Sequence, residues 1–378
     1  MIIAITKETL PNESRVSLTP HSCSEFVKSG HKVRIESGAG LQSYYSDEDY
    51  ENVGVEVIKL KKDLYNNADI LTKVSPFLID ELDIIPKSTI IISLLQPTIE
   101  KDIVFKAKEK KLTGLSMHLI PRTTLAQKMD ALSSQANIAG YKAVIMGSMH
   151  IGVYMPLLMT AAGTIRPAKV LIIGAGVAGL QAIATAKRLG AQVEAFDVRP
   201  EVKEQVESLG AKFVEVESTS DDGVGEGGYA KETSDEYKQK QQTLIREHIS
   251  KADMVITTAL IPGKKAPILI SSDVVDLMKP GSVIMDLAAE NGGNCELTKK
   301  DEIINHKNII IDGTSNIPST MPIHASDLYS KNIVALIKHL IKDDVVDLDM
   351  NDEIIAGSTY THNGEITHQQ TKEIIEGK

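Results

Sequence analysis

The chain has 378 residues and a mass of 41.1 kDa, a length that suggests two domains or one large α/β unit with an addition. Its composition, 42% hydrophobic and 24% charged residues, excludes a disordered, collagen-like or coiled-coil protein. The net charge of −10 argues against the basic surface of a general nucleic-acid binder.

Cysteine usage and hydropathy set further limits. Cys23 and Cys295 lie far apart and form no CxxC pair, so we expect no zinc site, no disulfide framework and a reducing compartment. No apolar run approaches the roughly 18 residues of a membrane helix, and no basic region precedes an apolar stretch at the N-terminus. We therefore expect a chain that is soluble by itself and carries no secretory signal.

Short β-branched runs alternate with helical stretches up to about residue 120, which predicts parallel βαβ units and one α/β domain. The expected strands are Ile2–Thr6, Val33–Glu36, Val55–Ile58, Ile70–Val74, Thr89–Leu94 and Leu112–Ser116, with helices at Ser22–Ser29 and Glu100–Lys111. From Ala126 to Met149, the absence of proline and the helical spacing of apolar residues predict one long helix, capped by Thr123 or Thr124.

A second α/β series begins at about residue 166. Its expected strands are Lys169–Ile173, Gln192–Phe196, Ala211–Val216, Met254–Thr258, Val283–Leu287 and Asn308–Asp312, followed by a helix at Ser326–Ile341. We expect this helix and the polar, acidic tail to return to the first domain. The predicted domains are therefore 1–125 with 326–378, and 126–325.

The segment Ser218–Glu236 breaks the pattern, with four glycines, many acidic residues and one aromatic residue, Tyr229. It is too polar to bury and too long for a typical α/β connection. Two interpretations stay open: a mobile loop that acts as a lid, or a solvated surface loop.

The sequence GAGVAG, from Gly174 to Gly179, matches the dinucleotide fingerprint GxGxxG in the right context. An apolar strand precedes it and a helical stretch, Leu180–Leu189, follows. In this motif Gly174 permits the tight turn, Gly176 lets the backbone approach a pyrophosphate, and Gly179 lets the helix pack on the strand. Asp197 ends the next strand and would accept hydrogen bonds from the ribose hydroxyls, which favours NAD(H) over NADP(H), although Arg199 nearby weakens that preference. The alternative is a glycine-rich turn in a domain that binds no nucleotide.

A narrow polar stripe is predicted on the long helix. Gln127, Asp130, Ser134 and Asn137 follow the spacing i, i+3, i+7, i+10, and Arg122 and Ser133 lie nearby. Such a stripe among small apolar residues suits a site that hydrogen-bonds an amide or a ribose. The alternative is an ordinary solvent-exposed helix face.

Several long motifs resemble the NAD(H)-binding subunit of proton-translocating nicotinamide nucleotide transhydrogenase, and the resemblance covers essentially the whole chain. Besides the fingerprint, the motifs are Arg122–Val144, Met159–Thr164, Phe196–Gly210, Gly227–Glu232, Thr257–Gly263 and Asp286–Cys295. The resemblance implies an α/β fold of two Rossmann-like domains with parallel sheets, linked by long helices, and NAD(H) in the cleft between the domains. It also implies a homodimer and direct hydride transfer to NADP(+) on a partner subunit, coupled to proton translocation.

The resemblance assigns roles to individual residues. Arg122, Gln127, Asp130 and Ser133 resemble the catalytic contacts at the nicotinamide end. The remaining cofactor-binding residues it implies are Thr123, Thr124, Gly174, Gly176, Val177, Ala178, Gly179, Asp197, Val198, Arg199, Gly228, Tyr229, Gln241 and Leu260. No metal site is implied, and the loop around Tyr229 resembles a loop that closes on the nucleotide.

The chain ends at Lys378 without the membrane helices that follow this domain in many members of the family. The resemblance therefore implies a three-subunit arrangement, with an NADP(H)-binding beta subunit and a small membrane-spanning alpha subunit as partners. It implies a cytoplasmic chain that attaches to the inner membrane through these partners.

The chain also resembles alanine dehydrogenase, which shares the architecture and needs an acid–base histidine in a Leu-His segment. Here that segment reads Leu95-Gln96, and Glu290 stands at the position of that family's aspartate. Glutamine cannot titrate near neutral pH. Arg15 and Lys73, which resemble its carboxylate-binding residues, are present, so an amino-acid dehydrogenase stays open as the alternative. A non-catalytic NAD(H)-binding regulatory subunit is the third hypothesis.

Overall fold

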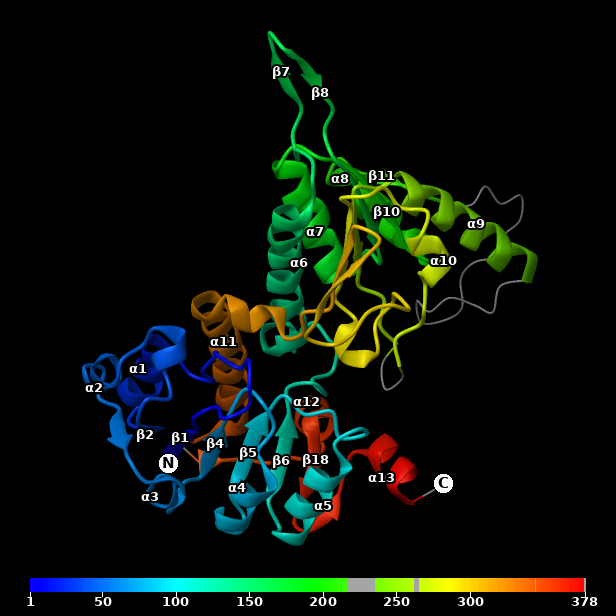
Figure 1. Ribbon diagram of the computed structural model, residues 1–378. Helices are drawn as coiled ribbons and strands as arrows, with labels where there is room; N and C mark the ends of the chain where they lie inside the picture. The colour runs from blue at the N-terminus through cyan, green and yellow to red at the C-terminus, as the bar shows by residue number, and fades with distance from the viewer. Residues whose placement is uncertain (216–234, 262–264, 344, 377–378) are drawn as a thin grey trace. The chain divides into compact units, whose positions relative to one another are not determined.

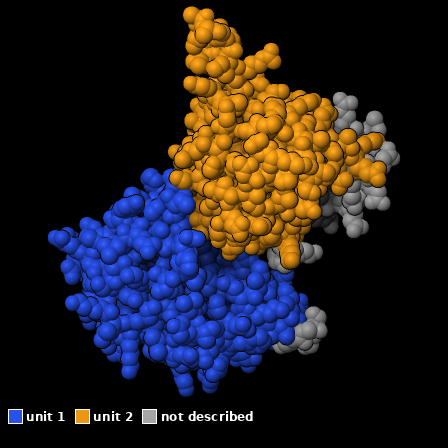
Figure 2. All heavy atoms as spheres, in the orientation of Figure 1, with its two compact units in different colours: residues 1–135, 318–378 blue, residues 136–317 orange. Residues whose placement is uncertain are grey.

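The structure is a computed structural model that describes residues 1–215, 235–261, 265–343 and 345–376. The chain forms two compact units, which Figure 2 shows in different colours. Unit 1 comprises residues 1–135 and 318–378, and unit 2 comprises residues 136–317. Both ends of the chain therefore belong to unit 1, and the units change at 135 and 318 where the sequence suggested 125 and 326.

Unit 1 is built on an eight-stranded sheet in the order β19-β18-β6-β5-β4-β1-β2-β3 (Figure 1). Strands β1 to β6 are parallel, and β18 and β19 are antiparallel at one edge. The strands are β1 Ile2–Ile5, β2 Lys32–Glu36, β3 Glu56–Ile58, β4 Ile70–Thr72, β5 Ile90–Ser93, β6 Thr113–Ser116, β18 Thr359–His362 and β19 Glu365–Ile366. A two-stranded ribbon, β16 Ile341–Lys342 and β17 Val345–Val346, accompanies this sheet.

Helices cover both faces of the unit 1 sheet, because its strands are apolar on both sides. In β1, Ile3 and Ile5 enter one buried cluster, and Ala4 enters the other. The helices that lie wholly in unit 1 are α1 Pro20–Lys28, α2 Asp47–Glu51, α3 Lys61–Tyr65, α4 Ile79–Ile84, α5 Lys101–Glu109, α11 Pro322–Leu340, α12 Glu353–Ser358 and α13 Gln369–Glu376, with 3-10 turns η1 Leu41–Ser43 and η2 Gln127–Met129. The 3-10 turn η5, Ile317–Thr320, lies where the chain enters unit 1 for the second time.

The C-terminal tail adds regular structure that its scattered apolar residues did not reveal. Strand β18 pairs with β6 across a sequence separation of more than 240 residues, as Thr359 opposite Leu115 shows. Tyr360 is buried against Gly114, where a Cβ atom would lie 2.2 Å from the tyrosine ring. The glycine at 114 therefore makes room for the ring that fastens the tail to the sheet.

Unit 2 is built on a seven-stranded sheet in the order β11-β10-β9-β12-β13-β15-β14, parallel except for β14. The strands are β9 Lys169–Ile173, β10 Gln192–Phe196, β11 Lys212–Phe213, β12 Met254–Thr257, β13 Val283–Asp286, β14 Ile303–His306 and β15 Ile309–Asp312. The helices are α7 Val177–Arg188, α8 Lys203–Ser208, α9 Asp235–Lys251 and α10 Ser272–Val275, with 3-10 turns η3 Pro200–Val202 and η4 Ala289–Asn291. The strand expected at Ala211–Val216 is shorter, and residue 216 lies outside the described residues.

The two sheets share one topology. If the first six strands of unit 1 are numbered in chain order, they run 3-2-1-4-5-6, and strands β9, β10, β11, β12, β13 and β15 of unit 2 do the same. This is the strand order of dinucleotide-binding folds, in which a ligand binds where the order reverses, outside the carboxyl ends of strands 1 and 4. The expected α/β class with two mostly parallel sheets is confirmed.

The long helix, α6, begins later than the sequence suggested. It runs from Ala131 to His150, after the separate turn η2, and Asp130 between them has non-helical backbone angles (φ −71°, ψ 84°). The Asp130 carboxylate accepts hydrogen bonds from the backbone N–H of Ser133 at 2.9 Å and from its hydroxyl at 2.6 Å. The N-cap is therefore Asp130 and neither Thr123 nor Thr124, because a carboxylate placed before Ala131 satisfies the first free N–H groups of the helix.

A β-hairpin in unit 2 was also missed. Strands β7, Leu158–Thr160, and β8, Gly163–Ile165, pair antiparallel and extend away from the rest of unit 2 (Figure 1). The hairpin coincides with the motif Met159–Thr164. Among the described residues, no helix is both long and apolar enough to cross a bilayer.

Candidate functional site

The glycine-rich turn of unit 2 follows β9 and leads into α7. Gly174 has φ +102°, a conformation that favours glycine, and its carbonyl oxygen lies 1.9 Å from where a Cβ atom of residue 179 would stand. A Cβ at Gly176 would meet no atom within 4 Å, so the backbone is open to a ligand there. Gly176 is also the N-cap of α7 and has no side chain to occupy the N–H groups of Val177 and Ala178. This cradle fits the pyrophosphate of a dinucleotide.

Asp197 follows β10, the strand next to β9, and its carboxylate is already engaged within unit 2. Oδ2 accepts from Ala175 N at 2.7 Å, and Oδ1 accepts from Arg199 N at 2.9 Å. The Arg199 guanidinium adds bonds of 3.0 Å to each oxygen. The side chain of Asp197 is 5% exposed and that of Arg199 is 37% exposed, so Arg199 can move away to admit ribose hydroxyls.

The segment after β12 completes this edge of the unit 2 sheet. Thr258 Oγ1 donates to Gly174 O at 3.0 Å, and Leu260, half exposed, follows it. Strand β12 adjoins β9 at the point where the strand order reverses, so the glycine turn, Asp197 and Thr258 lie at the expected ligand crevice. Val177 and Val198, both more than a third exposed, add apolar surface at the same strand ends.

Asn294 supports this segment, a role that the sequence motif did not disclose. Its side chain accepts from Ala259 N at 3.0 Å and donates to Ala259 O and Pro267 O at 2.9 Å. Its backbone N–H donates to the buried carboxylate of Asp286 at 2.7 Å. The sequence showed an asparagine after a Gly-Gly pair, but the pairing with residue 259 depends on the fold.

The remaining residues assigned to unit 2 are placed less fully. Gln241 lies in α9 and is partly buried. Gly228 and Tyr229, with the predicted lid, lie outside the described residues.

The nicotinamide-end residues are neighbours in unit 1. Arg122 and Thr124 are exposed, Thr123 is partly exposed, Gln127 is exposed on η2, and Asp130 and Ser133 pair with each other. The predicted helical stripe is wrong in this region, because Gln127 lies in a 3-10 turn and Asp130 precedes the helix. Gln127 and Asp130 are instead brought together by the joint between η2 and α6. His118 lies near this segment, and burial and the Arg122 charge lower its pKa.

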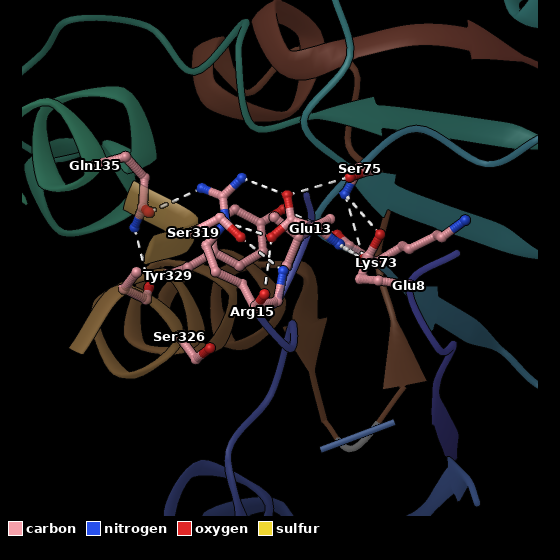
Figure 3. Close-up of polar contacts among 12 residues, drawn as sticks. Glu8, Glu13, Arg15, Lys73, Ser75, Gln135, Ser319, Ser326 and Tyr329 are labelled. Carbon is pink, nitrogen blue, oxygen red and sulfur yellow. Dashed lines mark hydrogen bonds and ion pairs between the residues drawn. The ribbon is translucent and has the colours of Figure 1, made fainter. Parts of the chain in front are cut away.

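A cluster of buried charged side chains fills the crevice of unit 1 that corresponds to the nucleotide edge of unit 2 (Figure 3). Arg15 makes a two-pronged contact with Glu13, at 2.8 and 2.6 Å, and donates to Gln135 Oε1 at 2.9 Å. Lys73, fully buried, donates to Glu81 Oε2 at 2.7 Å. Arg15 and Lys73 are thus each paired with a carboxylate of the same unit; sequence reasoning had identified the two cations but not these partners.

Glu8 stands at the strand reversal of unit 1, between the ends of β1 and β4. Its Oε1 accepts from Val74 N at 2.6 Å and from Ser75 N at 3.3 Å. Burial raises the pKa of Glu8 to about 8, with a further increase from Glu13, although Lys73 and the Val74 bond oppose the shift. Glu8 is therefore mostly uncharged at neutral pH.

This pKa makes stability depend on pH in a defined direction. Between pH 4.5 and about 8 the folded chain keeps a proton on Glu8 that the unfolded chain has lost, so this contribution to stability decreases as pH rises through that window. We expect Glu8→Gln, which keeps an oxygen for Val74 N, to remove the decrease and to be the more stable protein at pH 8 by a few kcal/mol, since one pKa unit is worth about 1.4 kcal/mol. Denaturant unfolding at pH 5 and pH 8 measures this, with the exposed Glu365→Gln as control. Parallel pH profiles for wild type and Glu8→Gln would contradict it.

The two positions that distinguish the chain from an alanine dehydrogenase are also placed. Gln96 follows β5, and its backbone N–H donates to Glu100 at 2.7 Å. Glu290 lies in η4 and is exposed. In the described regions of the chain no group of three or more metal-ligating side chains comes together.

Comparison with known proteins agrees with this geometry. The model of the alanine dehydrogenase/PNT N-terminal domain matches residues 4–139, and that of the alanine dehydrogenase/PNT C-terminal domain matches residues 143–369. This chain belongs to the alanine dehydrogenase/PNT family. Within the family, NAD(P) transhydrogenase subunit alpha of Cereibacter sphaeroides is 46% identical over 97% of this chain and 71% of its own length. The first part of NAD(P) transhydrogenase subunit alpha of Rickettsia prowazekii is 41% identical over 100% of this chain and 98% of its own length.

Solved structures and more distant relatives follow the same order. The crystal structure of a transhydrogenase from Sinorhizobium meliloti has a TM-score of 0.87 and 42% identity, and covers 97% of this chain and 100% of the other. An alanine dehydrogenase of Methanococcus maripaludis is more distant, at 30% identity over 85% of this chain and 82% of its own length.

Proposed function

We propose that this chain is the NAD(H)-binding subunit of a proton-translocating transhydrogenase and works by direct hydride transfer between NADH and NADP(+) on a partner subunit. The observation that carries this proposal is the combination of a complete, open dinucleotide cradle in unit 2 with Gln96 at the position where an amino-acid dehydrogenase needs its acid–base histidine. Transfer between two nicotinamide rings exchanges no proton with a side chain, so orientation and exclusion of water are the tasks of the protein.

The residues divide into an anchor and a clamp. NAD(H), when bound, supplies or accepts the hydride. The free N–H groups at the start of α7 hold its pyrophosphate, and Asp197 receives the adenosine ribose hydroxyls after Arg199 moves aside. Arg122, Gln127, Asp130 and Ser133 hold the nicotinamide end, and the Ser133 bonds fix the Asp130 carboxylate in one orientation. Tyr229 closes over the nucleotide.

The alternative is an alanine dehydrogenase-like oxidoreductase, for which the retained Arg15 and Lys73 speak. The experiment mixes the purified chain with the NADP(H)-binding subunit and follows transfer from NADPH to an NAD analogue of distinct absorbance, beside a reaction of the chain alone with NAD(+) and L-alanine. We expect transfer in the first and no NADH in the second. Robust NADH formation from alanine would favour the alternative, and no reaction in either would favour a regulatory NAD(H)-binding subunit.

We propose further that the chain forms a homodimer through the β7–β8 hairpin. The segment Ala143–Ile165 contains no Asp, Glu, Lys or Arg, in a chain with 24% charged residues. Its exposed side chains include Tyr154, Leu157 and Met159, the last 72% exposed. A lone two-stranded hairpin is marginally stable in water, so these apolar groups need a partner surface, and symmetric dimers are the commonest assemblies.

Met159→Asp should dissociate this dimer, because it places a charge in the apolar contact. Sedimentation or light scattering should then show the 41.1 kDa monomer in place of a dimer. Ile303→Asp, at an exposed apolar residue on β14 of the same unit, should stay dimeric. A monomeric wild type, or a dimeric Met159→Asp protein, would disprove this interface.

The subunit names of the relatives imply further chains. We propose that these are an NADP(H)-binding beta subunit and a small membrane-spanning alpha subunit, and that they hold this chain at the cytoplasmic face of the inner membrane. Co-purification of the chain with membranes only when those subunits are co-expressed would support this arrangement.

A further inference from the structure

The turn that carries Gln127 is held from its buried side by one side chain of α11. Asn332, 7% exposed, donates from Nδ2 to the backbone oxygen of Lys128 at 2.9 Å. Its Oδ1 accepts from Ser134 Oγ at 2.8 Å. Asn332 therefore bridges η2 and the first turn of α6, on either side of Asp130.

A second buried amide fastens the same joint. Gln135 donates to Ala325 O at 3.1 Å and accepts from Arg15 Nη1 at 2.9 Å (Figure 3). Apolar neighbours add to the contact, since Ala126, Met129 and Ala131 are buried in the core that α11 helps to form. The joint is thus fixed on its inner face, while Gln127 is exposed on the outer face.

We propose that Asn332 is a positioning residue for hydride transfer, which acts by fixing the turn of Gln127 through the Lys128 carbonyl. The inference rests on the proposed function, because it assumes that Gln127 orients the nicotinamide. Asn332 directs a side-chain donor of α11 at the backbone of η2, and a shift of about 1 Å at a positioning group can cost a reaction two orders of magnitude in rate.

Asn332→Asp isolates this contact, because the aspartate keeps an oxygen for Ser134 and loses the donor for Lys128. In the complex with the NADP(H)-binding subunit we expect the transfer rate at saturating nucleotide to decrease by about tenfold or more, with the NADH dissociation constant within about twofold of wild type. The uncharged Asn332→Ser should show the same division if the aspartate prevents folding. Lys331→Ala, which removes the adjacent exposed ion pair with Asp327, should leave both quantities unchanged.

The double variant Asn332→Asp/Gln127→Asn distinguishes positioning from a general structural role. If Asn332 acts through Gln127, the double variant should be no slower than Gln127→Asn alone, since residues that act as a unit are not additive. Rate losses that multiply, or a loss of NADH affinity and thermal stability with an unchanged rate, would overturn the inference. Absence of transfer in the wild-type complex would overturn the proposed function itself, whereas normal transfer by Asn332→Asp would overturn the inference alone.

Discussion

Gly179→Ala is expected to weaken NADH binding by roughly 100-fold or more, equal to about 2.7 kcal/mol, and to destabilise unit 2. A Cβ atom at this position would lie 1.9 Å from Gly174 O and 3.4 Å from a methyl group of Ile172. The first of these neighbours is backbone in a turn with φ +102°, so the clash can be relieved only by moving α7 away from β9. Overpacking of this kind typically costs about 1–3 kcal/mol. Fluorescence titration with NADH and thermal unfolding measure the two effects.

Gly176→Ala is the matched control, because it separates binding from folding. No atom lies within 4 Å of a Cβ at this position and φ is −76°, so the substitution should leave thermal unfolding unchanged. The added methyl group would nevertheless occupy the space of the pyrophosphate, and NADH affinity should decrease. Wild-type affinity in Gly179→Ala, or in Gly176→Ala, would show that the nucleotide does not use this turn.

Gln127→Asn is expected to decrease hydride transfer by about 10- to 100-fold with little change in NADH affinity. The shorter side chain withdraws the amide from the nicotinamide end, and the anchor at the start of α7 is untouched. Stopped-flow transfer in the complex with the partner subunit gives the rate, and fluorescence titration gives the affinity. Lys128→Gln, at the next exposed residue, is the control. Equal losses of rate and affinity would contradict the assignment of Gln127 to orientation.

The sequence predicted best what local patterns determine. Strands β9 and β10 have the expected bounds, Lys169–Ile173 and Gln192–Phe196, because a buried parallel strand is written as a short apolar run between turn residues. The start of α6 was wrong because Asp130, which resembled one more polar residue of a helical face, uses its carboxylate as an N-cap. Periodicity alone does not show which polar residue interrupts a helix.

Long-range contacts account for most of what could not be predicted. Glu8 meets residues 74 and 75, and Arg15 meets Gln135, so the buried charge cluster of unit 1 has no signature within any one segment. The same holds for Asn332, whose two partners lie about 200 residues earlier, and for Tyr360 against Gly114. The cations Arg15 and Lys73 were visible in the sequence, but their carboxylate partners became known only from the fold.

Direct passage of hydride from one nicotinamide to the other, with no acid–base group of this chain involved, is the central claim. The most direct measurement uses NADH deuterated at C4 on the transferred side, with NADP(+) and the NADP(H)-binding subunit, followed by mass spectrometry of the products. We expect all transferred deuterium at C4 of NADPH and none in water. Deuterium released to water, or NADPH formed without deuterium, would contradict direct transfer.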